Sequence, residues 1–427
     1  MRILLVNPPN CGRSIPEEAY GITAVKEIFR GEPLGLEVIA GNLDGHDIAI
    51  CDLKAEPDSL WTAYERFQPQ VVGFTAATCE ANRVIQYAEE IKKSFHPVIV
   101  VGGHHASCDP AYFNRACLDY VVAGLGKASF RELIDRIEQK GETGNIPGVA
   151  RTNPDGKLSL PRRTFTPSDL VDDKPPRYDL VEKNRDAYIL AKLGMNIGFI
   201  VTAFGCTHRC SFCTIPTTTG GKYLVHSVES VIRDIRLLKE IPFIRMVDAN
   251  TFGDVAAAEA LCDRIMEEDI RKRFLADIRS DTVVRHPDLI GKWKRAGLSN
   301  VIVGFEDVSD GALAAYNKRL DVETSRRAIE ILHEHGVSIV GDFIVSPDYG
   351  YEDFMRLETF VRENRIDIPI FSILTPVPGT PLHGAMQERI EVTDLDYYTF
   401  LNAVTPTRLA KEEFYRTFAD LFMSFHH

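Results

Sequence analysis

The sequence predicts an α/β protein with two parallel sheets in one chain of 427 residues. Short apolar runs alternate with amphipathic, helix-length segments five times before about residue 145. They do so six more times between about residues 191 and 385. Prolines and turn signals are dense between these regions, from about 146 to 190. Alternation of this kind is typical of parallel strands joined by helices, and the proline-rich stretch is typical of a connector.

The first region, 1–145, is predicted to be a doubly wound parallel sheet. Expected strands are 3–7, 47–53, 71–75, 98–101 and 119–123, and expected helices are 33–43, 80–94 and 129–140. Ligands of such sheets bind beyond the carboxyl ends of the strands. The loops expected at this edge are 8–10, 75–78, 102–107 and 124–127, and their small residues let the backbone approach a ligand closely.

The connector, 146–190, carries one local signal. Asp155-Gly156 stands between 148–151 and 157–160, which predicts a β-hairpin. Beyond it, the proline-rich composition favours an extended surface strap.

The second region, 191–385, is predicted to hold six parallel strands with right-handed crossovers. The expected strands are 199–204, 243–247, 274–278, 301–305, 338–345 and 370–374. In the tail, 386–427, aromatic and leucine side chains recur at helical spacing from Phe414 to Phe425. We expect a helix there that packs on the second region. The alternative is an apolar wall for a hydrophobic substrate.

The overall composition excludes several classes. Lys and Arg number 49 against 61 Asp and Glu, a net charge of −12, which argues against a nucleic-acid binder. Met1-Arg2 leads directly into a strand-like run, so we expect no secretory signal, and no apolar run is long enough for a membrane span. Nine cysteines, an odd number, favour a reducing cytoplasm over a disulfide framework.

The most informative motif is a loop with three cysteines. Cys206, Cys210 and Cys213 follow the apolar run 199–204 with the spacing C-x-x-x-C-x-x-C. A structural zinc site or an ordinary four-iron cluster needs four protein ligands. Three thiolates on a cubane cluster leave one iron open for chemistry. The alternatives are a zinc knuckle with a distant fourth ligand and three small buried cysteines.

With Phe212 as the aromatic residue before the last cysteine, this loop resembles the cluster motif of radical S-adenosylmethionine (SAM) enzymes. The resemblance implies a [4Fe–4S] cluster whose open iron binds SAM, a SAM contact from Phe212, a 5′-deoxyadenosyl radical and a partial (β/α)6 barrel. It also implies an electron donor such as flavodoxin or ferredoxin.

Later strand ends extend this resemblance. Asp248 and Asn250 stand in a stretch similar to the family's Asp-Asp-Asn, which meets the SAM ammonium. Arg279 would pair with the SAM carboxylate, and Glu306 would bind the ribose hydroxyls. The stretch 376–382 is close to the family's Pro-x-Pro-Gly-Thr-Pro-Leu.

The first region resembles the cobalamin-binding domain fused in front of many radical SAM enzymes, in the loops at 7–9, 71–75 and 100–105. The resemblance implies cobalamin contacts from Asn7, Pro8, Thr75, Thr78, Gly102, Gly103, His104, Gly124 and Gly126. The Asp-x-His-x-x-Gly motif of other B12 proteins is absent, and Lys127 departs from the usual Gly-Glu-Gly-Glu. The alternative is a flavodoxin-like module that binds nothing.

Together these resemblances imply a cobalamin-dependent radical SAM enzyme, most simply a methyltransferase acting on an unactivated carbon through methylcobalamin. Residues 397–409 resemble a segment of hopanoid C-3 methylases, which implies a hydrophobic small-molecule substrate such as an isoprenoid or other lipid. Two alternatives remain open. One is a cyclase or rearrangement enzyme without methyl transfer, and the other is a non-catalytic iron–sulfur or zinc protein.

Overall fold

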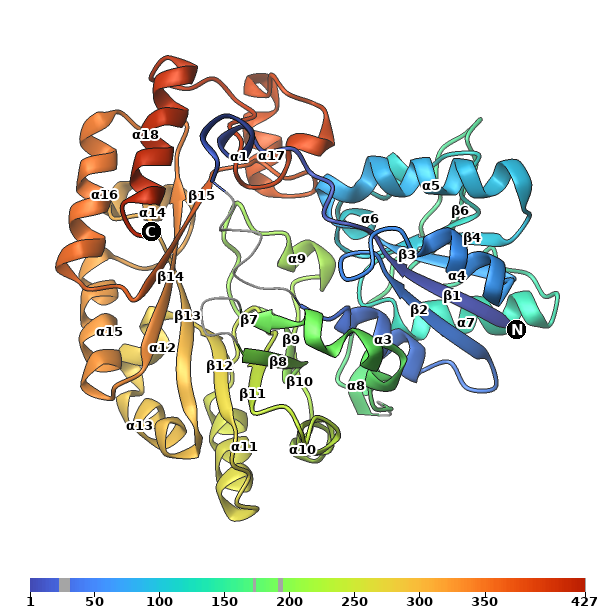
Figure 1. Cartoon of the computed structure of the whole chain (residues 1–427), viewed down its shortest axis with the longest axis horizontal. Helices are drawn as coiled ribbons and strands as arrows, with labels where there is room; N and C mark the ends of the chain where they lie inside the picture. Colours follow the sequence, from blue (N-terminus) through green and yellow to red (C-terminus); the bar gives the residue numbers. More distant parts are fainter. Residues whose placement is uncertain (23–30, 172–173, 191–194, 427) are drawn as a thin grey trace.

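The structure is a computed structural model that describes residues 1–22, 31–171, 174–190 and 195–426. Two α/β lobes lie side by side (Figure 1). The first contains most of the amino-terminal third of the chain, and the second contains the rest. Helix α1 (Ile15–Tyr20) is an exception, because it packs beside the carboxyl-terminal tail: the backbone N–H of Ile15 donates to the side chain of Asn402 at 2.8 Å.

The first lobe is a six-stranded sheet of order β2-β1-β3-β4-β5-β6, parallel except for β6. The strands are β1 (Arg2–Asn7), β2 (Asp47–Asp52), β3 (Val71–Thr75), β4 (Val98–Gly102), β5 (Tyr120–Val122) and β6 (Val149–Arg151). The helices are α3 (Leu34–Gly41), α4 (Leu60–Phe67), α5 (Ala81–Ser94), α6 (His104–Cys108) and α7 (Lys127–Glu138). Leu4 and Val6 pack on the side of α4 and α5, and Ile3 and Leu5 pack on the side of α3 and α7. This alternation confirms the predicted doubly wound sheet.

The connector departs from the prediction. Strand β6 lies within the predicted connector and pairs with β5, whereas 157–160 is irregular, so the expected hairpin is wrong. Burial explains the outcome, since Val149 and Ala150 are buried at the edge of the first sheet. The rest of the strap contains α8 (Ser168–Val171) and η3 (Tyr178–Ala187). It joins the lobes, because the Tyr178 hydroxyl donates to the Phe199 carbonyl at 2.9 Å.

The second lobe is a seven-stranded sheet of order β15-β14-β13-β12-β11-β8-β7. Its strands are β7 (Ile189–Leu190), β8 (Met195–Ile200), β11 (Phe243–Met246), β12 (Arg273–Ile278), β13 (Leu298–Glu306), β14 (Ser338–Val345) and β15 (Ile368–Ile373). In the described part of this sheet, β8, β11, β12, β13, β14 and β15 are parallel and confirm the six predicted units, and β7 pairs antiparallel with β8.

Helices cover the outer face of this curved sheet (Figure 1). They are α10 (Val228–Leu237), α11 (Val255–Glu267), α12 (Ser280–Arg285), α13 (Pro287–Ala296), α14 (Asp310–Ala315), α15 (Val322–Glu334) and α16 (Tyr351–Glu363). The sheet is thus an open half-barrel, and its active edge is expected at the carboxyl ends of the strands.

The predicted strand 199–204 is two strands in the structure. Strand β8 ends at Ile200, and Ala203–Gly205 forms β9, which pairs antiparallel with β10 (Tyr223–Val225). The three-cysteine loop therefore begins from a small hairpin above the half-barrel. Asp248 explains the break, since its carboxylate accepts hydrogen bonds from the backbone N–H groups of Thr202 and Ala203 and turns the chain there.

The second region ends in α17 (Pro381–Met386), and the tail forms α18 (Lys411–Met423). Phe414, Phe418, Leu421 and Phe422 are buried in the hydrophobic core of the second lobe. The expected packing helix is confirmed. These aromatic side chains do not line a substrate wall, because the core covers them.

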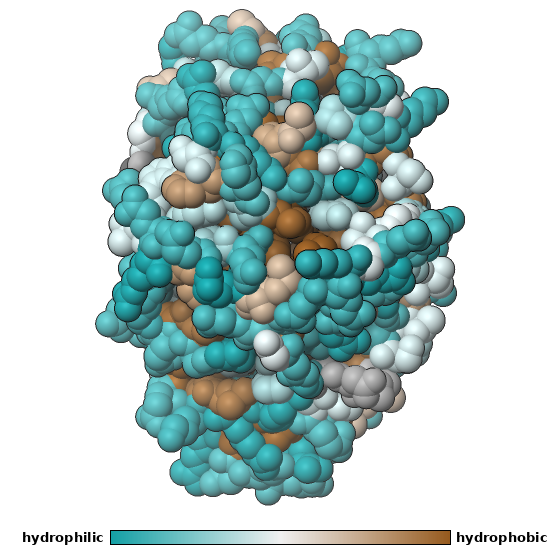
Figure 2. Space-filling view, turned by 90° about the vertical axis from the view of Figure 1, so that its right-hand side faces the viewer, coloured by the Kyte–Doolittle hydropathy of each residue, from teal (hydrophilic) through white to brown (hydrophobic). Residues whose placement is uncertain are grey.

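Two expectations from the sequence concern membrane spans and disulfide bonds. No helix among the described residues is long and apolar enough to cross a bilayer. The face of the molecule in Figure 2 is mostly hydrophilic, with apolar residues recessed between polar ones. All nine cysteines are free, as predicted for a chain without a disulfide framework.

Candidate active site

The cysteine loop lies between β9 and the short helix α9 (Ile215–Thr218). Two backbone contacts hold it against the barrel rim. The N–H of Ser211 donates to the carbonyl of Tyr316 at 2.9 Å, and the N–H of Leu382 donates to the carbonyl of Ser211 at 2.9 Å. Phe212 packs edge-on against Tyr316, with ring centroids 5.7 Å apart. The predicted aromatic residue thus anchors the loop, and its contact with SAM remains a prediction.

Two of the three thiols, those of Cys210 and Cys213, lie in surroundings that favour their neutral form. Burial raises the pKa of Cys213 to about 12 and also raises the pKa of Cys210, against the pull of Lys318 and Arg279. Among the described residues no three His, Cys, Asp or Glu side chains converge on one ion. Three thiols on one short loop match the three-cysteine ligand set of a cubane cluster, whereas a closed structural zinc site needs a fourth protein ligand.

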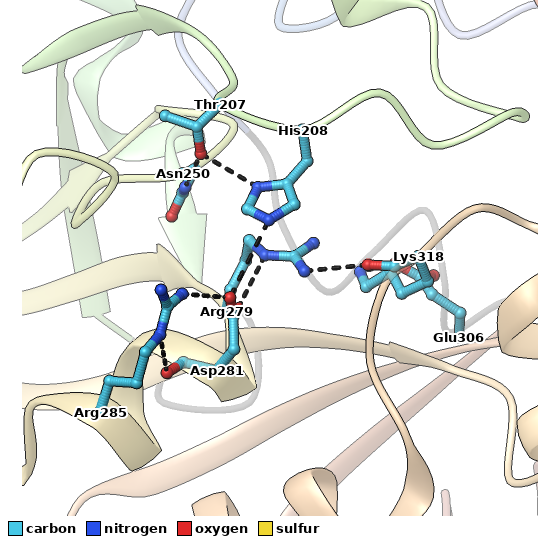
Figure 3. Close-up of polar contacts among 8 residues, drawn as sticks. All are labelled: Thr207, His208, Asn250, Arg279, Asp281, Arg285, Glu306 and Lys318. Carbon is cyan, nitrogen blue, oxygen red and sulfur yellow. Dashed lines mark hydrogen bonds and ion pairs between the residues drawn. The ribbon is translucent and has the colours of Figure 1, made fainter.

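Polar side chains connect the loop to the neighbouring strand ends (Figure 3). The Thr207 hydroxyl lies 3.0 Å from Nδ1 of His208 and 3.4 Å from Nδ2 of Asn250. On the other side, Nε2 of His208 lies 3.9 Å from the carboxylate of Asp281. The loop thereby contacts the ends of β11 and β12.

Asn250 offers the clearest free acceptor at this edge. The side chain is 1% exposed, and its Oδ1 atom has no hydrogen-bond partner in the described part of the chain. The Tyr223 hydroxyl donates to the Asn250 carbonyl at 3.0 Å and fixes the turn. A buried acceptor without a donor is costly, so Oδ1 suits an ammonium group of a ligand. This fits the predicted SAM contact.

Asp248 has a different environment from the one predicted. One of its carboxylate oxygens accepts from the Thr202 and Ala203 N–H groups, at 2.8 and 2.9 Å, and the other accepts from the Thr202 hydroxyl at 2.6 Å. Both oxygens are engaged and the side chain is buried. Asp248 therefore braces the turn below the cysteine hairpin, and a direct SAM contact is not apparent for it.

Arg279 and Glu306 each have a protein partner. Arg279 pairs with Asp281 at 2.9 Å and donates to the Lys318 carbonyl at 3.0 Å, while Glu306 pairs with the Lys318 ammonium at 2.5 Å (Figure 3). Arg279, Glu306 and Lys318 lie close to Cys210 and influence its pKa. A ligand would have to share Arg279 and Glu306 with these partners.

Charged side chains also lie within the strands of the half-barrel, on β11, β12 and β14. Arg245 pairs with Asp277 at 3.3 Å. Burial raises the pKa of Asp277 to about 6 and that of Asp342 to about 8, and Glu306 adds to the effect at Asp342. Sequence reasoning missed this layer, because the positions within a buried parallel strand are expected to hold apolar residues.

A cavity of about 340 Å³ lies between the lobes, at the carboxyl ends of β1, β3, β4 and β5. Of the predicted cobalamin contacts, Thr75, Gly102, Gly103, His104, Gly124 and Gly126 line it. Asn7 instead lines an adjoining cleft of about 930 Å³, which Thr75 and His104 share. Pro8 and Thr78 line neither space. Ala203, Phe204 and Gly205, which precede the first cysteine, form the opposite wall of the smaller cavity.

Glycines let the segments that line this cavity pack closely against one another. At Gly103, where φ is +92°, an added Cβ would lie 2.5 Å from the Thr75 hydroxyl oxygen. Gly73 lies in mid-strand, and its Cβ would lie 3.0 Å from a methyl group of Leu5. A glycine inside a strand marks close approach of another group. This cradle fits a broad planar cofactor, so the residues present fit cobalamin. Sequence reasoning missed Gly73, although its place in the run 71–75 was a signal.

The two adjacent histidines differ. His104 reaches the second lobe, where its Nε2 lies 2.8 Å from the Thr214 hydroxyl, directly after Cys213, and burial lowers its pKa. His105 is buried against Tyr112 and Phe113, and burial lowers its pKa to about 4. Only His104 therefore faces the space between the lobes.

A half-barrel with a three-cysteine loop at its active edge, joined to a doubly wound lobe with a glycine cradle, defines a radical SAM enzyme with a B12-binding domain. Comparison with known proteins agrees. Residues 24–134 match the B12 binding domain, and residues 200–361 match the radical SAM superfamily.

Two relatives and one solved structure are similar along most of the chain. The hopanoid C-3 methylase of Methylococcus capsulatus is 30% identical over 91% of this chain and 75% of its own. The anaerobic magnesium-protoporphyrin IX monomethyl ester cyclase of Rubrivivax gelatinosus is 24% identical over 79% of this chain and 62% of its own. The radical SAM methyltransferase TsrM of Kitasatospora setae, solved with cobalamin and a [4Fe–4S] cluster, has the same fold, with a TM-score of 0.73, 20% identity, and coverage of 91% and 78%.

The chain belongs to the family of B12-binding radical SAM enzymes. It is an enzyme whose cofactors are a [4Fe–4S] cluster, SAM and cobalamin. The zinc-protein and empty-module alternatives are thereby excluded.

Proposed function

We propose that this enzyme transfers a methyl group to an unactivated carbon of a hydrophobic small molecule, such as an isoprenoid or other lipid. The observation that carries the proposal is the shared wall between the two cofactor sites. Phe204 and Gly205, directly before Cys206, line the same cavity as Gly102 and Gly103 of the first lobe. A methyl carrier in this cavity would adjoin the cysteine loop.

When bound, the cluster and SAM supply a radical that removes a hydrogen atom from carbon, and cobalamin supplies the methyl group. The protein's residues position and shield these groups. Cys206, Cys210 and Cys213 would hold the cluster, and Asn250 Oδ1 would accept from the SAM ammonium. Thr75, Gly102, Gly103 and His104 would cradle cobalamin.

The residues between the two sites are suited to an apolar substrate. Val247, directly after β11, is 40% exposed and lines both the cavity and the adjoining cleft. Phe199 and Leu34 also line that cleft. Apolar walls exclude water from a reactive carbon centre and favour a hydrophobic ligand. The similarity to hopanoid C-3 methylase supports the same substrate class.

Two further parts of the proposal concern the setting of the reaction. Reductive cleavage of SAM consumes an electron, and we assign its supply to a partner of the flavodoxin or ferredoxin type. Nine free cysteines support a reducing compartment, the cytoplasm.

Methyl transfer is tested by product mass. The enzyme, reconstituted under anaerobic conditions with cluster and cobalamin, is incubated with reductant, methyl-deuterated SAM and a small-molecule extract of the producing cells. The proposal predicts a product that carries a labelled methyl group, together with 5′-deoxyadenosine and S-adenosylhomocysteine. 5′-Deoxyadenosine with an unlabelled, isomerised or cyclised product would contradict methylation.

That second outcome would support the other candidate, a radical cyclase without methyl transfer. The similarity to the magnesium-protoporphyrin IX monomethyl ester cyclase is the observation that favours it. The higher identity and greater coverage of the hopanoid methylase favour methylation.

A further inference from the structure

The outer side of the cysteine loop has its own opening to the surface. A cavity of about 530 Å³ there is lined by Arg209, Cys210, Cys213, Pro216, Thr217, Gly379, Thr380, Pro381, His383 and Gly384. The Thr217 hydroxyl donates to the Gly379 carbonyl at 2.8 Å and fixes one wall. Two of the three cysteines thus line this cavity, and one of them, Cys210, also lies close enough to Lys318 and Arg279 for these cations to influence its pKa.

Exposed cations lie on this cavity and on the segments that contact its wall. Arg209 lines the cavity, its guanidinium lies against Gly221, where an added Cβ would be 2.7 Å from its Nη2 atom, and the exposed Lys222 is the next residue. The Asn317 side chain donates to the Arg209 carbonyl at 2.7 Å, and the exposed Arg319 follows Asn317 by two residues. No acidic residue is found among the described residues that line the cavity. We call Arg209, Lys222 and Arg319 with this cavity the donor surface.

This local charge is opposite to that of the chain, which carries a net charge of −12. An acidic partner is therefore repelled by most of the molecule and attracted at the donor surface. Such contrast steers association and sets orientation more than it adds affinity. The place where it occurs is also where the buried Cys210 and the partly buried Cys213 come closest to a surface opening.

We propose that the donor surface docks an acidic one-electron carrier protein and that the electron enters the cluster at the edge held by Cys210 and Cys213. In this step the carrier's reduced flavin or iron–sulfur centre loses one electron and the cluster gains one. No bond or proton moves. The inference rests on the proposed radical function and specifies the site for its electron donor.

The test compares two reductants on the reconstituted holoenzyme. The initial rates of cluster bleaching and of 5′-deoxyadenosine formation are measured with a reduced acidic flavodoxin and with dithionite, a small reductant that needs no docking site. For Lys222→Glu/Arg319→Glu we expect the flavodoxin-driven rates to fall at least about tenfold, while the dithionite-driven rates stay within about twofold. In the unmodified enzyme, added salt should slow only the flavodoxin reaction.

The matched control is Lys239→Glu/Arg271→Glu. These side chains are exposed and lie at the amino ends of β11 and β12, away from the cysteine loop. The control should retain both rates. Equal loss with both reductants in the Lys222/Arg319 variant, or an unchanged flavodoxin rate, would overturn the docking site. Failure of the radical function itself is distinguished because the unmodified enzyme would then form no 5′-deoxyadenosine with dithionite.

Discussion

Nε2 of His104 lies 2.8 Å from the hydroxyl oxygen of Thr214. One residue follows β4 of the first lobe and the other follows Cys213 of the cysteine loop. This contact joins the edge of the cobalamin cradle to the edge of the cluster loop. Burial lowers the pKa of His104, which favours the neutral ring in this contact.

Replacing His104 tests this junction. We expect His104→Ala to weaken cobalamin binding by roughly two- to tenfold, the effect of losing one hydrogen bond in a cavity wall. His104→Gln should recover part of the affinity, because its amide can reach Thr214. Equilibrium dialysis of cobalamin against the cluster-containing protein measures both variants. The exposed His96→Ala serves as the control, and equal affinity in all four proteins would refute the role of His104.

The substitution Asp248→Asn tests whether Asp248 supports the turn at Thr202 and Ala203 or contacts SAM directly. The amide would place its NH2 group against donors that now point at a carboxylate, so we expect a loss of roughly 1–3 kcal/mol in stability and less cluster per chain. The affinity of the cluster-loaded fraction for SAM should change little. Thermal unfolding, iron analysis and SAM titration check these three quantities. Normal stability and cluster content with weakened SAM binding would instead make Asp248 a SAM ligand.

A cavity-filling substitution tests the cobalamin site. Val100 is 2% exposed, lies on β4 and lines the 340 Å³ cavity. Val100→Phe should reduce cobalamin retention at least about tenfold, because a ring would occupy space needed by the cofactor. Val100→Ala, which enlarges the space, should retain binding. Absorbance of bound cobalamin per folded chain is the measurement, with iron content as an internal control. Equal cobalamin retention in both variants would place the cofactor elsewhere.

Stability should respond to pH through the buried layer. Asp342 has its pKa raised to about 8 in the folded protein by burial and by Glu306 and Asp277, against Arg245 and Lys318. It binds its proton more tightly when folded, so its contribution to stability is lost as pH rises from about 4 through 8. Asp342→Asn should flatten this decline, and the slope contributed by Asp277, whose pKa is raised to about 6, should remain. The measurement is the melting temperature of the unmodified enzyme and of Asp342→Asn between pH 5 and 8.5. Parallel curves for the two proteins would contradict the raised pKa assigned to Asp342.

Much of the fold could be predicted because each parallel strand is buried on both faces and reads as a short apolar run. The runs at 71–75 and 338–345 coincide with β3 and β14. The break between β8 and β9 could not be predicted in this way. It depends on Asp248, 46 residues further along the chain than Thr202, and the apolar run from Phe199 to Phe204 conceals it.

The site residues also fall into a group that the sequence could locate and a group that it could not. Residues fixed by local loop geometry, such as Gly102, Gly103 and the cysteines, lie where the sequence placed them. Thr78 begins a short helical turn at Thr78–Glu80 and does not line the cavity. Arg279 and Glu306 share one partner, Lys318, which lies in the loop between α14 and α15, and no sequence spacing reveals such contacts.

The central claim is that Cys206, Cys210 and Cys213 hold the cluster that cleaves SAM. Its most direct test is the amount of 5′-deoxyadenosine formed under anaerobic conditions with SAM and dithionite, measured by mass spectrometry. The enzyme and a variant with all three cysteines changed to alanine are compared after identical reconstitution. The account predicts 5′-deoxyadenosine from the enzyme and none above background from the folded variant. Formation of 5′-deoxyadenosine by the variant would contradict it.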